Sequence, residues 1–195
     1  VIGVVIARDN ATSTDKLLPA ECTHGLVMVL GESSGNWSSE YSAGYVNDWA
    51  VANGYQNTTG TYYDGGAWSY VKNEYAKLLL GYNNTMALKG YIAQNAYTSG
   101  IIEALTAYSI QKPASVSDLY IPSISEMELI YSNVGVINAS LQAAGGSVLE
   151  NEAYWTVSEN EASSANAATV NPFTGALQGG KLKSATARVR FIFAF

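Results

Sequence analysis

The hydrophobic positions of this chain predict strands at its two ends and helices between them. Val1 to Ala7 and Gly25 to Leu30 are short apolar runs, rich in β-branched residues, and a polar loop separates them. We therefore expect two core strands here. Near the other end, Arg188 to Phe195 (RVRFIFAF) alternates, with Val189 and three phenylalanines on one face. This pattern predicts a last strand that presents a wall of apolar side chains to the core.

The middle of the chain has the spacing of helices. Aromatic residues recur at intervals of four after Asn36, which predicts a helix that ends near Asn53-Gly54, with a core-facing stripe of Trp37, Tyr41, Tyr45 and Trp49. Asn83-Asn84-Thr85 offers N-caps to a helix that runs towards Gln94. A further helical stretch, Tyr97 to Ile110, stops before Pro113.

Two more helices are marked by their ends. Ser123-Ile124-Ser125-Glu126 fits a capping box, and Met127, Ile130 and Tyr131 would form the buried face of the helix that follows it. A second helix, from about Val136 to Ala144, would end at Gly145-Gly146, where a left-handed cap is easy.

Strands return after this helix. They are expected at Ala153 to Val157, at Ala167 to Asn171 after a polar segment, and, beyond a turn at Pro172 to Gly175, at the C-terminus. Since the chain has no internal repeat and no linker, the order of strands, helices and strands predicts one α+β domain over residues 1–195, with the terminal strands in one sheet.

Composition and charge narrow the functional classes. Charged residues make up only 13% of the chain, the net charge is −6, and most of the ten basic residues are scattered, so the sequence has no electrostatic footprint for nucleic acid. The surface is instead rich in Tyr, Ser, Asn, Gly and Thr, which is typical of secreted proteins and of adaptable binding surfaces. No stretch approaches about 18 consecutive apolar residues, so we expect no membrane insertion by this segment.

Candidate catalytic groups are poorly placed. Cys22 and His24 are the only cysteine and histidine, and two residues apart on an extended segment they would point in parallel, so we interpret them as a buried thiol and a loop-end imidazole. A set of carboxylates could suit a glycosidase or a calcium site, but we interpret it as solvated: Glu150, Glu152, Glu159 and Glu161. The segment GALQGGKL is interpreted as a turn rather than a phosphate-binding loop. We therefore expect no catalytic residue, no metal and no cofactor.

Several segments, in chain order, are similar to a family of bacterial surface domains. They are IGVVIARD and CTHGLVMVL, then YNNTMAL, LYIPSISEMELIYSN and INASLQAAGG, and last YWTVSEN and RVRFIFAF. The chain resembles the C-type-lectin-like C-terminal domain of fimbrillin-associated and related exported proteins of Gram-negative gut anaerobes. Family members carry W-Y-L-P-S-x-x-E-L where this chain has Leu119 to Met127, and Y-W-S-S-[ST]-E where it has Tyr154 to Glu159.

The resemblance implies that the first and last strands pair, that two helices flank the sheet, and that a long irregular segment near the C-terminus presents a binding surface. Tyr154-Trp155 would anchor a strand, and residues 158–168 would lie on the exposed side that faces the ligand. The residues expected to contact the ligand are Trp155, Ser158, Glu159, Asn160, Glu161, Ser163, Ser164 and Asn166. Tyr62, Tyr63, Trp68 and Tyr70 would join either this site or the core.

These features together predict a non-enzymatic cell-surface binding module, of the adhesin or fimbrial-tip type, that recognises a glycan or protein ligand. The triplets that bind sugar through calcium in C-type lectins, E-P-N or Q-P-D and W-N-D, do not occur in the chain. The alternative is a structural fimbrial subunit that assembles by strand addition at the Val1 to Ile6 edge. In either case other fimbrial subunits are candidate partners, and we expect anchoring at the outer membrane through a region upstream of Val1.

Overall fold

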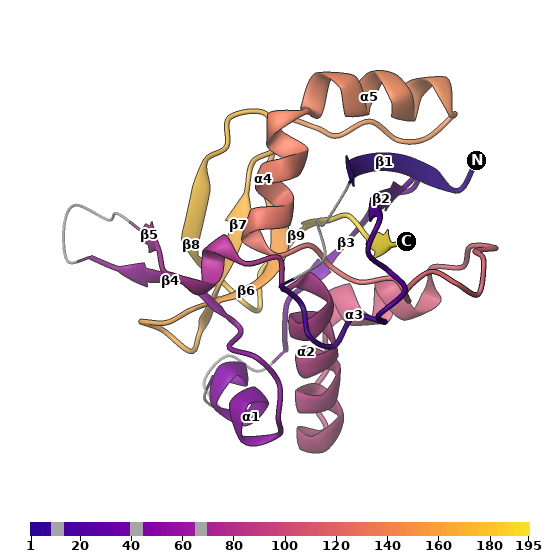
Figure 1. Ribbon diagram of the computed structural model, residues 1–195. Helices are drawn as coiled ribbons and strands as arrows, with labels where there is room; N and C mark the ends of the chain where they lie inside the picture. Colours follow the sequence, from indigo (N-terminus) through magenta and orange to yellow (C-terminus); the bar gives the residue numbers. More distant parts are fainter. Residues whose placement is uncertain (9–13, 40–44, 65–69) are drawn as a thin grey trace.

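The computed structural model describes residues 1–8, 14–39, 45–64 and 70–195, which form the predicted α+β fold (Figure 1). Ten strands, five α-helices and one short 3₁₀ helix are found in this part of the chain. Tyr41, Trp68 and Gly65-Gly66 lie outside the described residues. No helix within the described ranges is long and apolar enough to span a bilayer.

A small antiparallel sheet contains both terminal strands. Its order is β1 (Gly3–Arg8), β2 (Gly25–Val29) and β10 (Ile192–Ala194). The terminal strands thus share one sheet, as predicted, but the expected direct pairing between them is wrong because β2 lies between them. Every residue of β2 is buried, whereas β1 exposes Val5 and Arg8. The strand that is apolar at each position therefore takes the centre, and the partly polar strand takes an edge.

A larger sheet is built around β6 (Tyr154–Asn160). One edge of β6 pairs with β7 (Asn166–Val170); the other pairs first with β9 (Thr186–Val189) and then with β4 (Thr59–Tyr63). The sheet is completed by β3 (Ser33–Asn36) beside β9, β5 (Tyr70–Lys72) beside β4, and β8 (Leu177–Leu182) beside β7.

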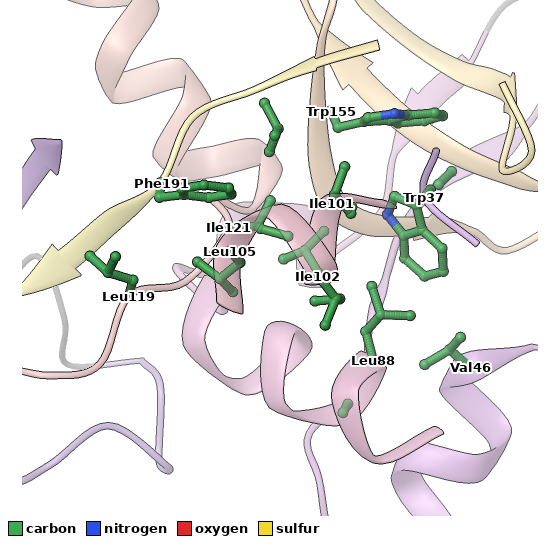
Figure 2. Packing of buried hydrophobic residues seen from close by; sticks show 14 of the residues in the cluster. Trp37, Val46, Leu88, Ile101, Ile102, Leu105, Leu119, Ile121, Trp155 and Phe191 are labelled. Atoms are coloured by element: carbon green, nitrogen blue, oxygen red, sulfur yellow. The ribbon is translucent and has the colours of Figure 1, made fainter. Parts of the chain in front are cut away.

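The apolar C-terminal run is divided between the two sheets. β9 belongs to the large sheet and β10 to the small one, so the single last strand predicted from Arg188 is interrupted at Arg190-Phe191. The predicted alternation is nevertheless confirmed: Val189, Phe191 and Phe193 lie in one buried cluster, while Ile192 and Ala194 lie in another. In the first cluster, Figure 2 shows side chains of α3 (Gly100–Ala107) beneath Trp155 and Phe191.

The helices lie where the sequence predicts them, with differences at their N-termini. Ser99 caps α3, and the last helix ends before Gly145, whose φ of 73° is left-handed, as expected. The helix expected from Asn36 begins only at Val46, because residues 33–36 pair with β9 instead. The remaining helices are α1 (Val46–Ala52), η1 (Tyr75–Lys77), α2 (Gly81–Asn95), α4 (Ile124–Ser132) and α5 (Val134–Ala143).

The N-terminus of α2 is capped by a distant segment. The predicted caps Asn83 and Asn84 lie inside the helix, and Oδ2 of buried Asp15 accepts a hydrogen bond of 2.7 Å from the backbone N–H of Asn83. A carboxylate at a helix N-terminus also interacts favourably with the helix dipole. Tertiary contact therefore supplies the cap that the local sequence was expected to supply.

The predicted capping box at the start of α4 is confirmed. The Glu126 carboxylate accepts a hydrogen bond of 2.6 Å from the backbone N–H of Ser123, and Met127 and Ile130 are buried as expected. Tyr131 was expected to share that face but is 40% exposed. Glu126 is itself buried, and this burial raises its pKa from 4.5 to about 7.

We expect the Glu126→Gln variant to show a flatter dependence of stability on pH. Since burial raises the pKa of Glu126 in the folded state, its contribution is fully present below pH 4.5 and is lost as the pH rises through 7. The glutamine amide of the variant would keep an acceptor for the Ser123 N–H without ionising. Urea unfolding should show a loss of stability between about pH 4 and about pH 8 that is smaller than in the unaltered protein by about 3 kcal/mol.

The matched control is Glu128→Gln on the same helix, where the carboxylate is exposed and pairs with Lys72. It should leave the pH dependence close to that of the unaltered protein. Equal pH slopes for Glu126→Gln and the unaltered protein would contradict the assignment of this effect to Glu126.

Candidate functional site

The segment expected to bind a ligand starts on a strand that is buried along its whole length. All seven residues of β6 are buried, since β6 is paired along both edges and α2 and α4 contact it. Trp155, Ser158, Glu159 and Asn160 therefore lie in the interior. The expectation that residues 158–168 form a long, irregular and exposed segment is wrong for these positions; only residues 161–165 are a turn between strands.

Trp155 is the anchor of β6. Its side chain is 0% exposed, and its indole N–H donates a hydrogen bond of 2.9 Å to the carbonyl of Gly35 on β3. Figure 2 shows the ring at the sheet side of the core, above Ile101. The expected anchoring role of Trp155 in the strand agrees with this position.

Glu159 is the centre of a buried polar cluster rather than a solvated carboxylate. It forms an ion pair with Lys183, and both side chains are almost completely inaccessible. Its two oxygens also accept hydrogen bonds from the first backbone N–H groups of α1, at Val46 (3.0 Å) and Asn47 (2.7 Å). The Lys183 ammonium lies 4.7 Å from the ring centroid of Trp37. Glu159 therefore holds α1 against the large sheet.

Ser158 and Asn160 make contacts of the same structural kind. The Ser158 hydroxyl accepts from the backbone N–H of Ile124, the first residue of α4, at 3.4 Å. The Asn160 amide donates to the carbonyl of Gly179 at 2.9 Å, and its oxygen accepts from the N–H of Ala162 at 2.7 Å. These bonds join β6 to α4, to β8 and to the turn that follows.

The accessible part of the predicted site is the turn from β6 to β7. Glu161 is exposed, and Ser163, Ser164 and Asn166 are half-buried. The backbone N–H of Glu161 donates to the carbonyl of Thr61 on β4 at 2.6 Å. The Asn73 side chain, just after β5, donates to the Glu161 carboxylate at 2.9 Å. The turn and the β4–β5 hairpin therefore meet at the same end of the large sheet.

The β4–β5 hairpin carries three tyrosines, Tyr62, Tyr63 and Tyr70, and we call the end of the hairpin that they surround the tyrosine face. Tyr63 pairs with Tyr70 on one side of the hairpin, and Tyr62 points to the other side. The pairing of β4 with β6 ends at Thr61, so the hairpin extends beyond the sheet, as Figure 1 shows. Tyr62 is 38% and Tyr63 41% exposed, and the rings of Tyr63 and Tyr70 lie 5.8 Å apart. A core role for Tyr62 and Tyr63 is therefore excluded.

Tyr70 rests on two glycines of β8. A Cβ atom placed at Gly180 would lie 2.0 Å from the Tyr70 hydroxyl oxygen, and one at Gly179 would lie 2.7 Å from its ring. The expectation that residues 175–182 form only a turn is thus wrong, because Leu177 to Leu182 pair with β7 as a strand. Glycines inside a strand mark a place where another group approaches closely. The pair Gly179-Gly180 is therefore the feature of the sequence that could have indicated this contact.

The remaining candidates for chemistry lie apart from this end of the sheet. Cys22 is buried and His24 exposed, as expected, and burial raises the pKa of the Cys22 thiol. Across the described ranges, no group of three or more His, Cys, Asp and Glu side chains could hold a metal ion. The arrangement at the tyrosine face offers flat aromatic rings, hydroxyl groups and one carboxylate, all of which can contact a ligand.

A solved structure has the same architecture over the whole of this chain. It is a fimbrial protein from Bacteroides ovatus ATCC 8483, with a crystal structure at 1.85 Å resolution, a TM-score of 0.80 and 24% sequence identity. The two proteins share a fold. The match covers 100% of the present chain and 44% of the Bacteroides chain, so the chain spans less than half the length of that protein. No protein-family model matches the sequence, and no curated protein matches it.

Proposed function

We propose that this chain is a binding module of a bacterial cell surface, of the adhesin or fimbrial-tip type, and that it recognises a glycan or protein ligand through the tyrosine face and the adjacent β6–β7 turn. The observation that carries the proposal is the exposure of Tyr62 and Tyr63 on a hairpin that extends beyond a rigid sheet. Tyrosines supply large, amphipathic contact area at low cost in conformational entropy.

The wider setting belongs to the same proposal. Residues 1–195 would be one C-type-lectin-like domain of a longer exported protein, held at the outer membrane through a preceding region and in contact with other fimbrial subunits. The fold shared with a fimbrial protein supports this setting. Of the predicted contact residues, Glu161, Ser163 and Ser164 lie on the accessible turn and Asn166 begins β7 beside it. Trp155, Ser158, Glu159 and Asn160 would act by holding that turn in place.

Strand addition is the second candidate function. β1 pairs only with β2 among the described strands, and a groove between β1 and α5 lies next to exposed Val5 and Val136. An unpaired strand edge is a template for a strand from another chain. In this alternative the chain is a structural fimbrial subunit, and its partner is another subunit.

Replacement of both Tyr62 and Tyr63 by alanine should weaken ligand binding at least tenfold while leaving the fold intact, because neither ring is buried. The measurement is binding of the purified chain to an array of mucin-type glycans and matrix proteins, with and without a calcium chelator. Binding that resists the chelator is expected, and the affinity for each ligand found is then compared between variants. The combined change of Ser163 and Ser164 to alanine should also weaken binding.

The matched control is Tyr131→Ala on α4, since Tyr131 is exposed to the same degree (40%) but belongs to a different element. It should bind like the unaltered chain. Full binding by the Tyr62/Tyr63 double variant would contradict the location of the site at the tyrosine face. The structural-subunit alternative would be favoured by two results together. The array would show no ligand, and the purified chain would self-associate in a way that replacement of Val5 by a charged residue abolishes.

A further inference from the structure

A second concave surface, separate from the tyrosine face, lies along β3 and β9. This hollow has a volume of about 690 Å³ and shares no residue with the tyrosine face. Ser34 pairs with Arg188 and Thr186 lies two residues from Arg188 on β9, so the hydroxyl groups of Ser34 and Thr186 share the face of Arg188, whereas Ser33 lies opposite the buried Val189. Ala153 and Ala187 are the only aliphatic residues of the lining. The volume falls in the range of small-molecule sites, but the wall is unusually polar for one.

The charged groups of the hollow are fixed by an extended network. Glu32 accepts a hydrogen bond of 2.6 Å from the Tyr154 hydroxyl, and it pairs with both Arg188 and the buried Arg190. Arg188 also donates to the Glu152 carboxylate at 2.8 Å. The guanidinium of Arg188 is therefore held in one orientation, while its side chain keeps 35% exposure. Groups fixed before a ligand arrives lose little entropy on binding.

Lys181 adds a cation that the network does not neutralise. Over the described part of the chain, Lys181 makes no ion pair; its ammonium lies 5.8 Å from the ring centroid of Trp155. Arg190 does not line the hollow and is buried behind Glu32, where it completes the network. Glu32, Glu152, Arg188 and Arg190 together carry no net charge, so Lys181 adds one positive charge to this place on a chain whose net charge is −6.

We propose that this hollow binds an acidic saccharide, whose carboxylate pairs with Lys181 and Arg188 and whose hydroxyl groups bond to Ser34, Thr186 and Glu152. A carboxylate matches an ammonium and a guanidinium at the mouth of a site through charge-assisted hydrogen bonds. The sugar ring suits a wall made of hydroxyl and carboxylate groups. Two alanine methyl groups offer a peptide no apolar pocket for a side-chain anchor.

The test compares acidic saccharides with neutral counterparts of matched size. Trigalacturonic acid is titrated against galactotriose, and 3′-sialyllactose against lactose, into the whole chain by calorimetry or ligand-observed NMR. We expect at least one acidic saccharide to bind tenfold or more tightly than its counterpart, and to bind less tightly as salt rises from about 50 to about 500 mM. Lys181→Gln should weaken that binding about tenfold without changing the thermal midpoint of unfolding.

The controls separate this site from the tyrosine face. Lys16→Gln removes an exposed lysine that lies outside the hollow and should bind the acidic saccharide like the unaltered chain. The Tyr62/Tyr63 double variant should also keep this binding. The proposal for the hollow and the proposal for the tyrosine face can therefore be contradicted separately. Equal binding of acidic and neutral saccharides, absence of binding by both acidic probes, or undiminished binding by Lys181→Gln would each overturn the proposal. Equally tight binding of inorganic sulfate alone would overturn its saccharide part.

Discussion

Replacement of Arg190 by alanine is expected to lower the free energy of unfolding by about 3–5 kcal/mol, because it leaves a cavity in place of a large buried side chain and removes a partner of Glu32 and of four carbonyl groups. The Arg190 side chain is fully buried and interrupts the apolar C-terminal run between β9 and β10. Its guanidinium donates hydrogen bonds of 2.5–3.2 Å to the carbonyls of Leu30, Gly31, Ser147 and Val148.

These four carbonyls belong to two connections that are far apart in the sequence, one between β2 and β3 and one between α5 and β6. Arg190 thus joins both connections to the point where the chain passes from the large sheet to the small one. Burial lowers the pKa of Arg190, whereas the nearby Glu32 carboxylate favours its charged form.

Urea unfolding of Arg190→Ala and Arg190→Lys measures the effect. Lysine keeps the charge but not the planar set of five donors, so it should recover only part of the lost stability. A loss below about 1 kcal/mol for alanine would contradict the role given to Arg190, since this is the range of ordinary surface changes. A chain that no longer unfolds cooperatively would agree with it.

Replacement of Lys183 by methionine should cost a similar amount, about 3–5 kcal/mol, because the Glu159 carboxylate then stays buried without its cation. Glu159 is 0% exposed and also holds the first N–H groups of α1, so the protein has no simple way to expose it. The loss should appear in urea unfolding.

A double-mutant cycle separates the ion pair from its surroundings. Lys183→Met combined with Glu159→Gln leaves neither charge of this pair, so its loss should be smaller than the sum of the two single losses by about 2 kcal/mol or more. The exposed pair Lys72–Glu128 is the control, since side chains that are 41% and 40% accessible contribute at most about 1 kcal/mol. Additive losses at Lys183 and Glu159 would contradict the coupling.

The parts of the fold that local chemistry controls were predictable from the sequence. The capping box of α4 and the end of α5 before Gly145 need only neighbouring residues, and both are where the sequence predicts them. The alternation of Val189, Phe191 and Phe193 likewise predicts a shared buried face, because side chains along an extended chain alternate by geometry, even though the chain changes sheets at Arg190.

The predicted site changed most between sequence and structure. A run of small polar residues after Tyr154-Trp155 resembles an exposed loop, yet strands on both sides cover Ser158, Glu159 and Asn160. Their polar groups are satisfied by Ile124, Lys183 and Gly179, which come from other parts of the chain. The spacing of residues within the segment does not indicate those partners, so the burial of Ser158, Glu159 and Asn160 could not be predicted from the segment itself.

The sequence by itself determined the α+β class, the approximate places of most strands and helices, and the polar, weakly charged composition of the surface. The tertiary structure alone decided that β2 separates the terminal strands, that Glu159 is buried, and that Tyr62 and Tyr63 extend beyond the sheet. It also brought Glu32, Glu152, Lys181 and Arg188 around one hollow. The physical reason is range: propensity, capping and alternation act over a few residues, whereas pairing, burial and charge networks depend on segments that meet only when the chain folds.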